Sequence, residues 1–94
     1  GFDTDSNLNR PGVFRLNIAA GRTRFQELLG YPPEAQADHH AQIDYTALDQ
    51  VLPHPMYGLQ GWVSILNPGP LTGDVARSLL RDARTRAANR QHRA

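Results

Sequence analysis

His54 stands between two prolines, and it is the strongest candidate for chemistry in this sequence. A residue that precedes proline avoids the α region, so the Pro53-His54-Pro55 backbone is stiff and the imidazole loses little entropy when it is fixed. A general base or an orienting hydrogen-bond donor needs such a fixed side chain. The alternative is a structural turn in which the ring caps backbone groups. The residues alone leave both interpretations open.

If His54 is catalytic, the hypothesis is a small enzyme that uses it with Tyr57 or Asn67, in a cleft beside the strand expected over residues 62–66. Against this, the sequence has no Gly-x-Ser-x-Gly and no other motif that joins a nucleophile, a base and an acid. It also has no cysteine. We therefore expect a small binding or structural module of unassigned molecular function, without a cofactor, and keep the enzyme as the alternative.

Two segments carry metal-ligating side chains. The run Asp3-x-Asp5-x-Asn7 begins like a calcium loop. However, loop positions six and twelve lack the glycine and the bidentate glutamate that such a loop needs. Residues 38–40 are Asp-His-His, and adjacent residues rarely converge on one ion. We therefore expect no metal site.

Positive charge gathers in the second half of the chain. Residues 1–52 carry four arginines and seven acidic residues, whereas residues 53–94 carry six arginines and two acidic residues. A solvated basic face is one interpretation, and neutralisation of nucleic-acid phosphates is the other. The absence of aromatic residues for stacking favours the solvated face. The candidate binding residues are Arg77, Arg81 and Arg84, followed by Arg86 and Arg90.

Hydrophobic spacing predicts an α+β domain with a small antiparallel sheet. A short helix follows the first strand, and a long C-terminal helix packs on one face of the sheet. Gly21 or Thr23 starts the short helix, with Thr23-x-x-Gln26 as a capping box, and Gly30 ends it. The expected elements are a strand over 13–18, a helix around 25–29, a strand over 62–66 and a helix from about Thr72 to the C-terminus.

The predicted core joins the two strands to the last helix. Its members are Phe14, Leu16, Ile18, Val63 and Ile65, closed by Leu79.

The 94 residues are expected to form a single domain, with residues 1–12 as a loop, 34–43 as a mobile loop and 88–94 as a frayed tail. No stretch is long and apolar enough to cross a membrane. The N-terminal residues lack the pattern of a signal peptide. The expected location is therefore the cytoplasm.

Three blocks of the sequence carry a family resemblance: residues 10–18, 53–58 and 61–68. Taken together they resemble DUF6194, an actinobacterial family of uncharacterised proteins, over nearly the whole chain. The order of elements is also similar to the YjbR-like (MmcQ-like) α+β fold. The first resemblance implies no known activity. The second implies only nucleic-acid binding, by analogy of fold.

The family resemblance also implies a strand-rich N-terminal segment that this sequence lacks. Two strands alone would form a thin sheet with open edges, which is barely stable in water. We therefore expect a homodimer that buries the exposed face of Trp62 and Leu66, or an edge of the strand that contains Phe14.

Overall fold

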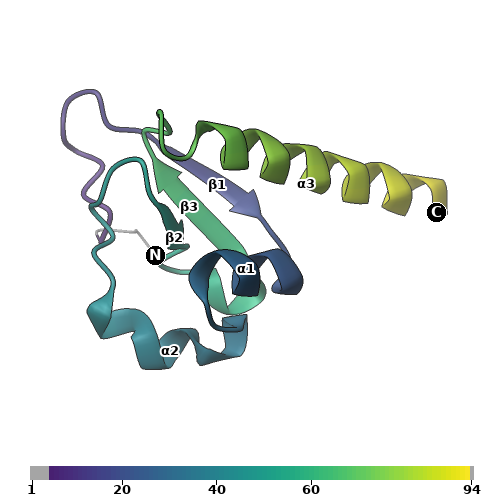
Figure 1. Ribbon diagram of the computed structural model, residues 1–94, viewed down its shortest axis with the longest axis horizontal. Coiled ribbons are helices and arrows are strands. Elements are labelled where there is room, and N and C mark those ends of the chain that lie inside the picture. The colour runs from purple at the N-terminus through teal and green to yellow at the C-terminus, as the bar shows by residue number, and fades with distance from the viewer. Residues whose placement is uncertain (1–4, 94) are drawn as a thin grey trace.

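The computed structural model describes residues 5–93, and the side chains of residues 5–89. It confirms the α+β class, with an antiparallel sheet and a long C-terminal helix (Figure 1). The strands are β1 (Arg15–Ala19), β2 (Val51–Pro53) and β3 (Trp62–Leu66). The helices are α1 (Arg22–Leu29), α2 (Gln36–His39) and α3 (Gly73–Arg93), with short 3₁₀ turns at Pro33–Ala35, His40–Gln42 and Gly58–Gln60.

The sheet has the order β1-β3-β2, and both pairs of neighbours are antiparallel. The central strand β3 places Val63 opposite Ile18 on one side and opposite Pro53 on the other. β2 was not predicted, because three residues ending in proline are too short to show an alternating pattern. This third strand pairs with the second edge of β3, so the sheet is wider than the sequence indicated.

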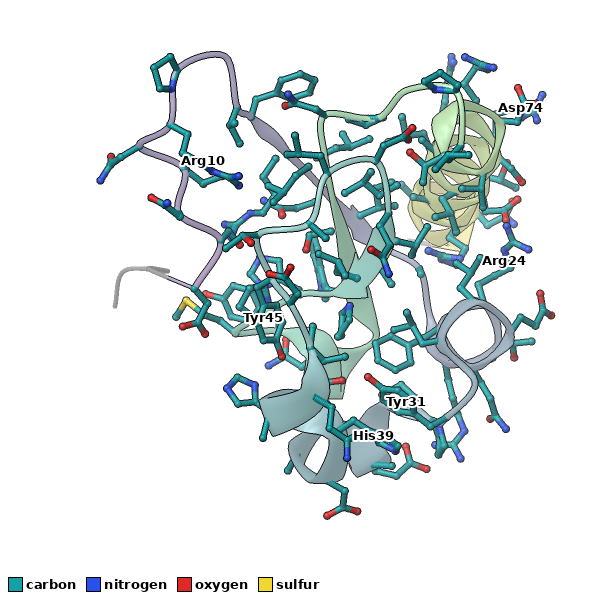
Figure 2. All side chains as sticks on the ribbon, turned by 60° about the vertical axis from the view of Figure 1, so that its left-hand side comes forward. Arg10, Arg24, Tyr31, His39, Tyr45 and Asp74 are labelled. Atoms are coloured by element: carbon teal, nitrogen blue, oxygen red, sulfur yellow. The ribbon has the colours of Figure 1, made fainter. Side chains whose placement is uncertain are left out.

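One face of the sheet packs against α1 and α3. Ile18 and Val63 of the strands meet Phe25 of α1 and Leu79 of α3, and these four side chains are buried. The ion pair between Arg24 Nε and Asp82 Oδ2, at 3.7 Å, links the two helices. Figure 2 shows Arg24 on the side of α1 that faces α3.

Phe14 was wrongly placed in the core. Phe14 is 59% exposed. β1 begins only at Arg15, so Phe14 lies before the strand and does not share the burial of Leu16 and Ile18. Its backbone still pairs with Asn67, just beyond the end of β3. In contrast, Leu66 is fully buried within the chain, so no second copy is needed to cover it.

Glycines with positive φ angles flank α1 at both ends. Gly30 has a φ of 85° and ends the helix in the left-handed conformation, as predicted. Gly21, with a φ of 84°, starts it, and no side chain caps it. The predicted capping box at Thr23 is therefore wrong.

The segment expected to be a loop, residues 34–43, instead forms consecutive helical turns. Pro33 sits at the first position of these turns, where its missing N–H costs nothing. The ring of His39 stacks on Tyr31 at a centroid distance of 3.9 Å and holds the segment against the chain (Figure 2). The mobility of this segment stays a prediction.

α3 begins at the sheet and continues past its edge (Figure 1). Arg86 reaches back from the helix and donates hydrogen bonds to the carbonyls of Ala19 and Ala20. The helix extends to Arg93, and fraying of residues 88–94 stays a prediction. Within the described part of the chain, no helix has the length and apolar character to span a membrane.

The second face of the sheet is only partly covered. Near the start of β1, the segment that contains Ser6 lies against it, and Arg15 Nη1 donates to the buried Ser6 Oγ at 3.3 Å. Arg10 ties the same segment to the Thr46 carbonyl at 3.0 Å. The other end of this face, around Trp62, carries the candidate site.

Candidate functional site

A cleft of about 210 Å³ opens on the second face of the sheet. β1, β3 and the connection from β2 to β3 supply its walls. Because side chains on neighbouring strands that lie in register share a face, Asn17, Trp62 and His54 point to the same side. The lining residues are Asn17, His54, Tyr57, Gln60 and Trp62.

His54 caps a single helical turn at the base of this cleft. Its carbonyl accepts the N–H of Gly58 at 3.0 Å. Its Nδ1 accepts the backbone N–H groups of Met56 at 3.0 Å and of Tyr57 at 3.1 Å. Pro55, which has no N–H, occupies the first position of the turn. This is the arrangement of a helix N-cap, with an imidazole where Asn, Asp or Ser is usual.

These two hydrogen bonds fix the protonation of the ring. An Nδ1 that accepts from two donors carries no proton, so the neutral ring holds its proton on Nε2. Burial lowers the pKa of the His54 imidazole, and the positive charge of Arg15 lowers it further. The ring is therefore neutral at pH 7. Its exposed fraction is 3%, so it lies at the bottom of the cleft.

Two aromatic rings border the cleft beside His54. The Tyr57 ring lies 4.9 Å from the imidazole and 6.5 Å from the Trp62 ring, with interplanar angles of 42° and 55°. Tyr57 is 46% exposed, and Trp62 is half-buried. The two rings thus present apolar faces to the opening rather than burying each other.

The polar groups of the cleft are available to a ligand. Among the described residues, none forms a hydrogen bond with His54 Nε2 or with the side-chain amides of Asn17 and Gln60. An imidazole N–H donates, and each amide both donates and accepts. The cleft therefore combines one N–H donor on a buried ring, two adaptable amides and two aromatic faces.

Of the residues proposed from the sequence for an enzyme site, the structure brings two together. His54 and Tyr57 share the cleft, but Asn67 lies beyond the far end of β3. There its Oδ1 accepts the N–H of Phe14 at 2.9 Å, and its Nδ2 donates to the Gly12 carbonyl at 3.0 Å. The Asn67 side chain is thus engaged in holding the start of β1.

The arginine candidates lie on a different part of the molecule. Arg77, Arg81 and Arg84 are exposed along α3, which packs on the opposite face of the sheet from the cleft. Arg77 pairs with Asp74. Arg86 is turned inward to the β1–α1 junction, and the side chain of Arg90 lies outside the described residues.

Residues Asn17, Gln60 and Trp62 were not proposed for a site from the sequence. Trp62 was expected only as an exposed surface of the strand. The missing information is strand register: it sets Trp62 beside His54, whose N–H donates to the Trp62 carbonyl at 3.0 Å. The described residues contain no group of three or more His, Asp or Glu side chains placed to hold a metal ion.

Fold and cleft together define a small α+β domain whose three-stranded antiparallel sheet is covered by helices on one face and carries an open cleft of about 210 Å³ on the other. A family model described as a family of unknown function, DUF6194, matches residues 1–94, and the chain belongs to this family. No curated protein and no solved structure matches the chain.

Proposed function

We propose that this chain is a binding module for a small planar molecule that carries a hydrogen-bond acceptor. The observation that carries the proposal is the His54 ring, buried at the base of the cleft with Nδ1 occupied and the Nε2 proton unused among the described residues. A ligand that supplies an acceptor gains a hydrogen bond from this N–H, which is open to the cleft, and shields the ring from water.

The walls favour a flat ligand. Trp62 and Tyr57 offer aromatic faces, and aromatic groups pack on such faces in offset or tilted arrangements. The volume of about 210 Å³ lies below the range of about 300–1,000 Å³ for drug-sized ligands, so one ring system fits better than a dinucleotide. The amides of Asn17 and Gln60 suit a ligand with its own donor and acceptor groups.

The state of the imidazole favours binding over proton abstraction. A general base needs a free lone pair, but Nε2 carries the proton and Nδ1 is held by two backbone N–H groups. An enzyme that uses His54 would therefore employ it as a donor to a polarised carbonyl, with Tyr57 beside it. The enzyme hypothesis survives in this restricted form as the alternative.

The single tryptophan of the chain gives a direct test, because it lines the cleft. We would follow the Trp62 indole N–H signal by ¹H–¹⁵N NMR while titrating benzamide, which has a flat ring and a carbonyl. We expect this signal to shift saturably. Cyclohexanecarboxamide, with the same amide on a saturated ring, should bind more weakly.

His54→Asn is the matched variant, because its side-chain oxygen can still cap the turn but no Nε2 proton remains. We expect its Kd for benzamide to rise about five- to tenfold, the effect of one lost hydrogen bond. The proposal fails if benzamide leaves the indole signal in place, or if the two proteins bind benzamide equally well.

Self-association forms a further part of the proposal. The outer edge of β1 has no neighbouring strand among the described residues, and Phe14 beside it is 59% exposed. Both features support a dimer through this edge. A cytoplasmic location and the likeness to the YjbR-like fold stay predictions, and neither carries the binding proposal.

A further inference from the structure

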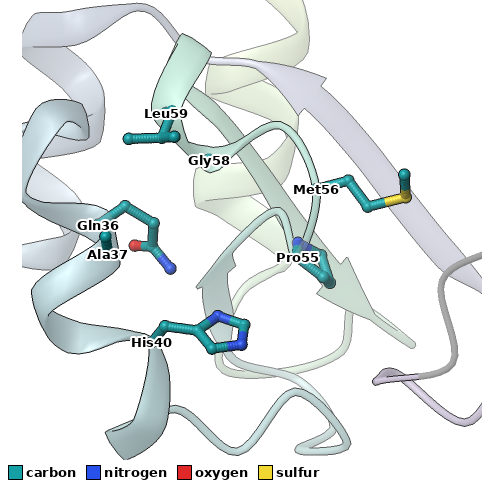
Figure 3. A pocket seen from close by; sticks show the side chains of 7 residues that line it. All are labelled: Gln36, Ala37, His40, Pro55, Met56, Gly58 and Leu59. Atoms are coloured by element: carbon teal, nitrogen blue, oxygen red, sulfur yellow. The ribbon is translucent and has the colours of Figure 1, made fainter.

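A second cleft, of about 280 Å³, lies on the other side of the connection between β2 and β3 (Figure 3). Its polar wall comes from the helical turns that follow α1, and its apolar wall comes from the connection itself. The lining residues are Gln36, Ala37, His40, Pro55, Met56, Gly58 and Leu59.

A directional chain of hydrogen bonds leads into this cleft. The Tyr31 hydroxyl donates to Gln36 Oε1 at 2.6 Å, and Gln36 Nε2 donates to the Tyr45 hydroxyl at 3.0 Å. The Tyr45 oxygen lies 2.8 Å from His40 Nδ1. Among the described residues, Nδ1 is the one acceptor that remains for the Tyr45 proton, so the Tyr45 hydroxyl donates to it. Burial raises the pKa of both tyrosines, so both hydroxyls keep their protons at neutral pH.

The chain leaves two N–H donors at the cleft. Because Nδ1 accepts from Tyr45, the N–H of the His40 ring is on Nε2. The Gln36 amide nitrogen has a second hydrogen, and Tyr45 is its only acceptor among the described residues. Gln36 is 6% exposed and held from both sides, so its orientation is fixed. Figure 3 shows the Gln36 amide and the His40 ring together on one side of the space.

The remaining lining of the cleft is apolar and accessible. Pro55, Met56 and Leu59 supply it, with Met56 44% and Leu59 59% exposed. Gly58 brings the backbone close, since a Cβ there would lie 3.1 Å from Gln36 Cγ.

No Arg or Lys is among the lining residues. A carboxylate would lose hydration without gaining a fixed positive charge, which is costly. An uncharged acceptor avoids this cost.

We propose that this cleft binds a small neutral carbonyl compound, such as an amide or ester, with a short aliphatic body. The carbonyl oxygen accepts from His40 and Gln36, and the aliphatic part packs on Met56 and Leu59. This site is separate from the cleft at Trp62, and it does not depend on the function proposed there.

The single methionine of the chain reports on this cleft, as the single tryptophan reports on the other. We would follow the Met56 methyl signal by ¹H–¹³C NMR while titrating hexanamide, hexanoate and, for comparison, benzamide. We expect hexanamide to shift the methyl signal saturably, hexanoate to bind at least fivefold more weakly, and benzamide to act mainly on the Trp62 indole.

Two variants test the donor and the apolar wall separately. His40→Phe keeps a ring beside Tyr45 but removes the donor, and Leu59→Ser shortens an exposed wall residue. Each should weaken hexanamide about five- to tenfold. His39→Phe is the matched control, because this neighbouring ring stacks on Tyr31 outside the cleft, and it should bind as the parent does.

Three results would overturn the proposal. They are a Met56 signal that hexanamide does not move, equal binding of hexanamide by His40→Phe and the parent, and tighter binding of hexanoate than of hexanamide. Loss of benzamide binding at Trp62 would leave this second site unaffected.

Discussion

Replacing His54 tests whether an imidazole acts as the cap of the turn beneath the cleft. In the parent protein its Nδ1 accepts from Met56 N–H and Tyr57 N–H, and the ring is almost fully buried. His54→Ala removes the acceptor and the ring together. In His54→Asn the side-chain oxygen takes the place of Nδ1, so the cap remains while the rest of the ring is lost.

The structure sets the expected magnitudes. An unsatisfied buried N–H costs about 1–3 kcal/mol. The two N–H groups here are only partly buried, so each should cost about 1 kcal/mol. With the lost packing of the ring, His54→Ala should lose about 2–3 kcal/mol of unfolding free energy. At about 4–8 °C per kcal/mol for a domain of this size, its Tm should fall by about 10–20 °C. His54→Asn should lose about 1 kcal/mol.

The pH dependence of stability distinguishes an imidazole cap, which titrates, from an Asn cap, which does not. Because burial lowers the pKa of His54 below its usual 6.5, the unfolded chain binds a proton that the folded chain does not. Stability is therefore constant above about pH 6.5 for this group and falls as the pH drops below it, by up to about 1.4 kcal/mol per pH unit. The difference in unfolding free energy by which the parent is more stable than His54→Asn should therefore shrink as the pH falls.

Thermal unfolding followed by circular dichroism between pH 5 and pH 8 would measure both effects. Since the other histidines are present in all three proteins, the differences between the curves report on His54 alone. If the Tm of the parent and the Tm of His54→Asn change with pH in the same way, the imidazole is not a neutral ring that accepts through Nδ1. A His54→Ala protein as stable as His54→Asn would refute the cap.

Three further predictions concern other parts of the chain. Asp49 accepts hydrogen bonds from the Thr72 hydroxyl and from the backbone N–H groups of Leu71, Gly69 and Thr72, and these bonds lower its pKa from 3.8 to about 2. Its contribution to stability is therefore present above about pH 4 and is lost as the pH falls towards 2. Asp49→Asn should lower the Tm at pH 7 and flatten its loss in acid, and unchanged acid dependence would contradict this. Gly61→Ala combines a φ of 83° with a Cβ 3.3 Å from the backbone of Gly21, and should cost about 1–3 kcal/mol in denaturant unfolding. Gly12→Ala, with a φ of 73° and open space, is its control and should cost less. Sedimentation should show a dimer at micromolar concentration that Phe14→Ser dissociates, whereas a monomeric parent would exclude self-association.

Periodicity in the sequence located the longer elements well. The expected strand over 62–66 matches β3, and Gly30 ends α1 as its lack of a Cβ allows. The short elements carried too little pattern. Three residues cannot show alternation, so β2 was missed, and the polar turns after Pro33 have no apolar stripe. Alternation also continues through Phe14, although β1 begins only at Arg15, because sequence does not say where a neighbouring strand ends.

The candidate site was predictable only where it is local. The two prolines beside His54 predict a fixed backbone, and the N–H groups that His54 caps lie two and three residues later in the sequence. Asn17 and Trp62 reach the cleft through strand register, which depends on pairings between distant segments. Asn67 was predicted to share the cleft beside the strand over 62–66, but it follows the C-terminal end of β3, whereas His54 pairs with Trp62 at the N-terminal end.

The strand order also indicates which parts of the sheet form first during folding. β2 and β3 are joined by a short connection, whereas α1, α2 and β2 separate β1 from β3 in the sequence. Closing a long loop costs more entropy than closing a short one, and non-local pairings form late. We therefore expect the hairpin of β2 and β3, with His54 already seated in its turn, to form first. The arrival of β1, bringing Asn17, then completes the wall of the cleft as one of the last events of folding.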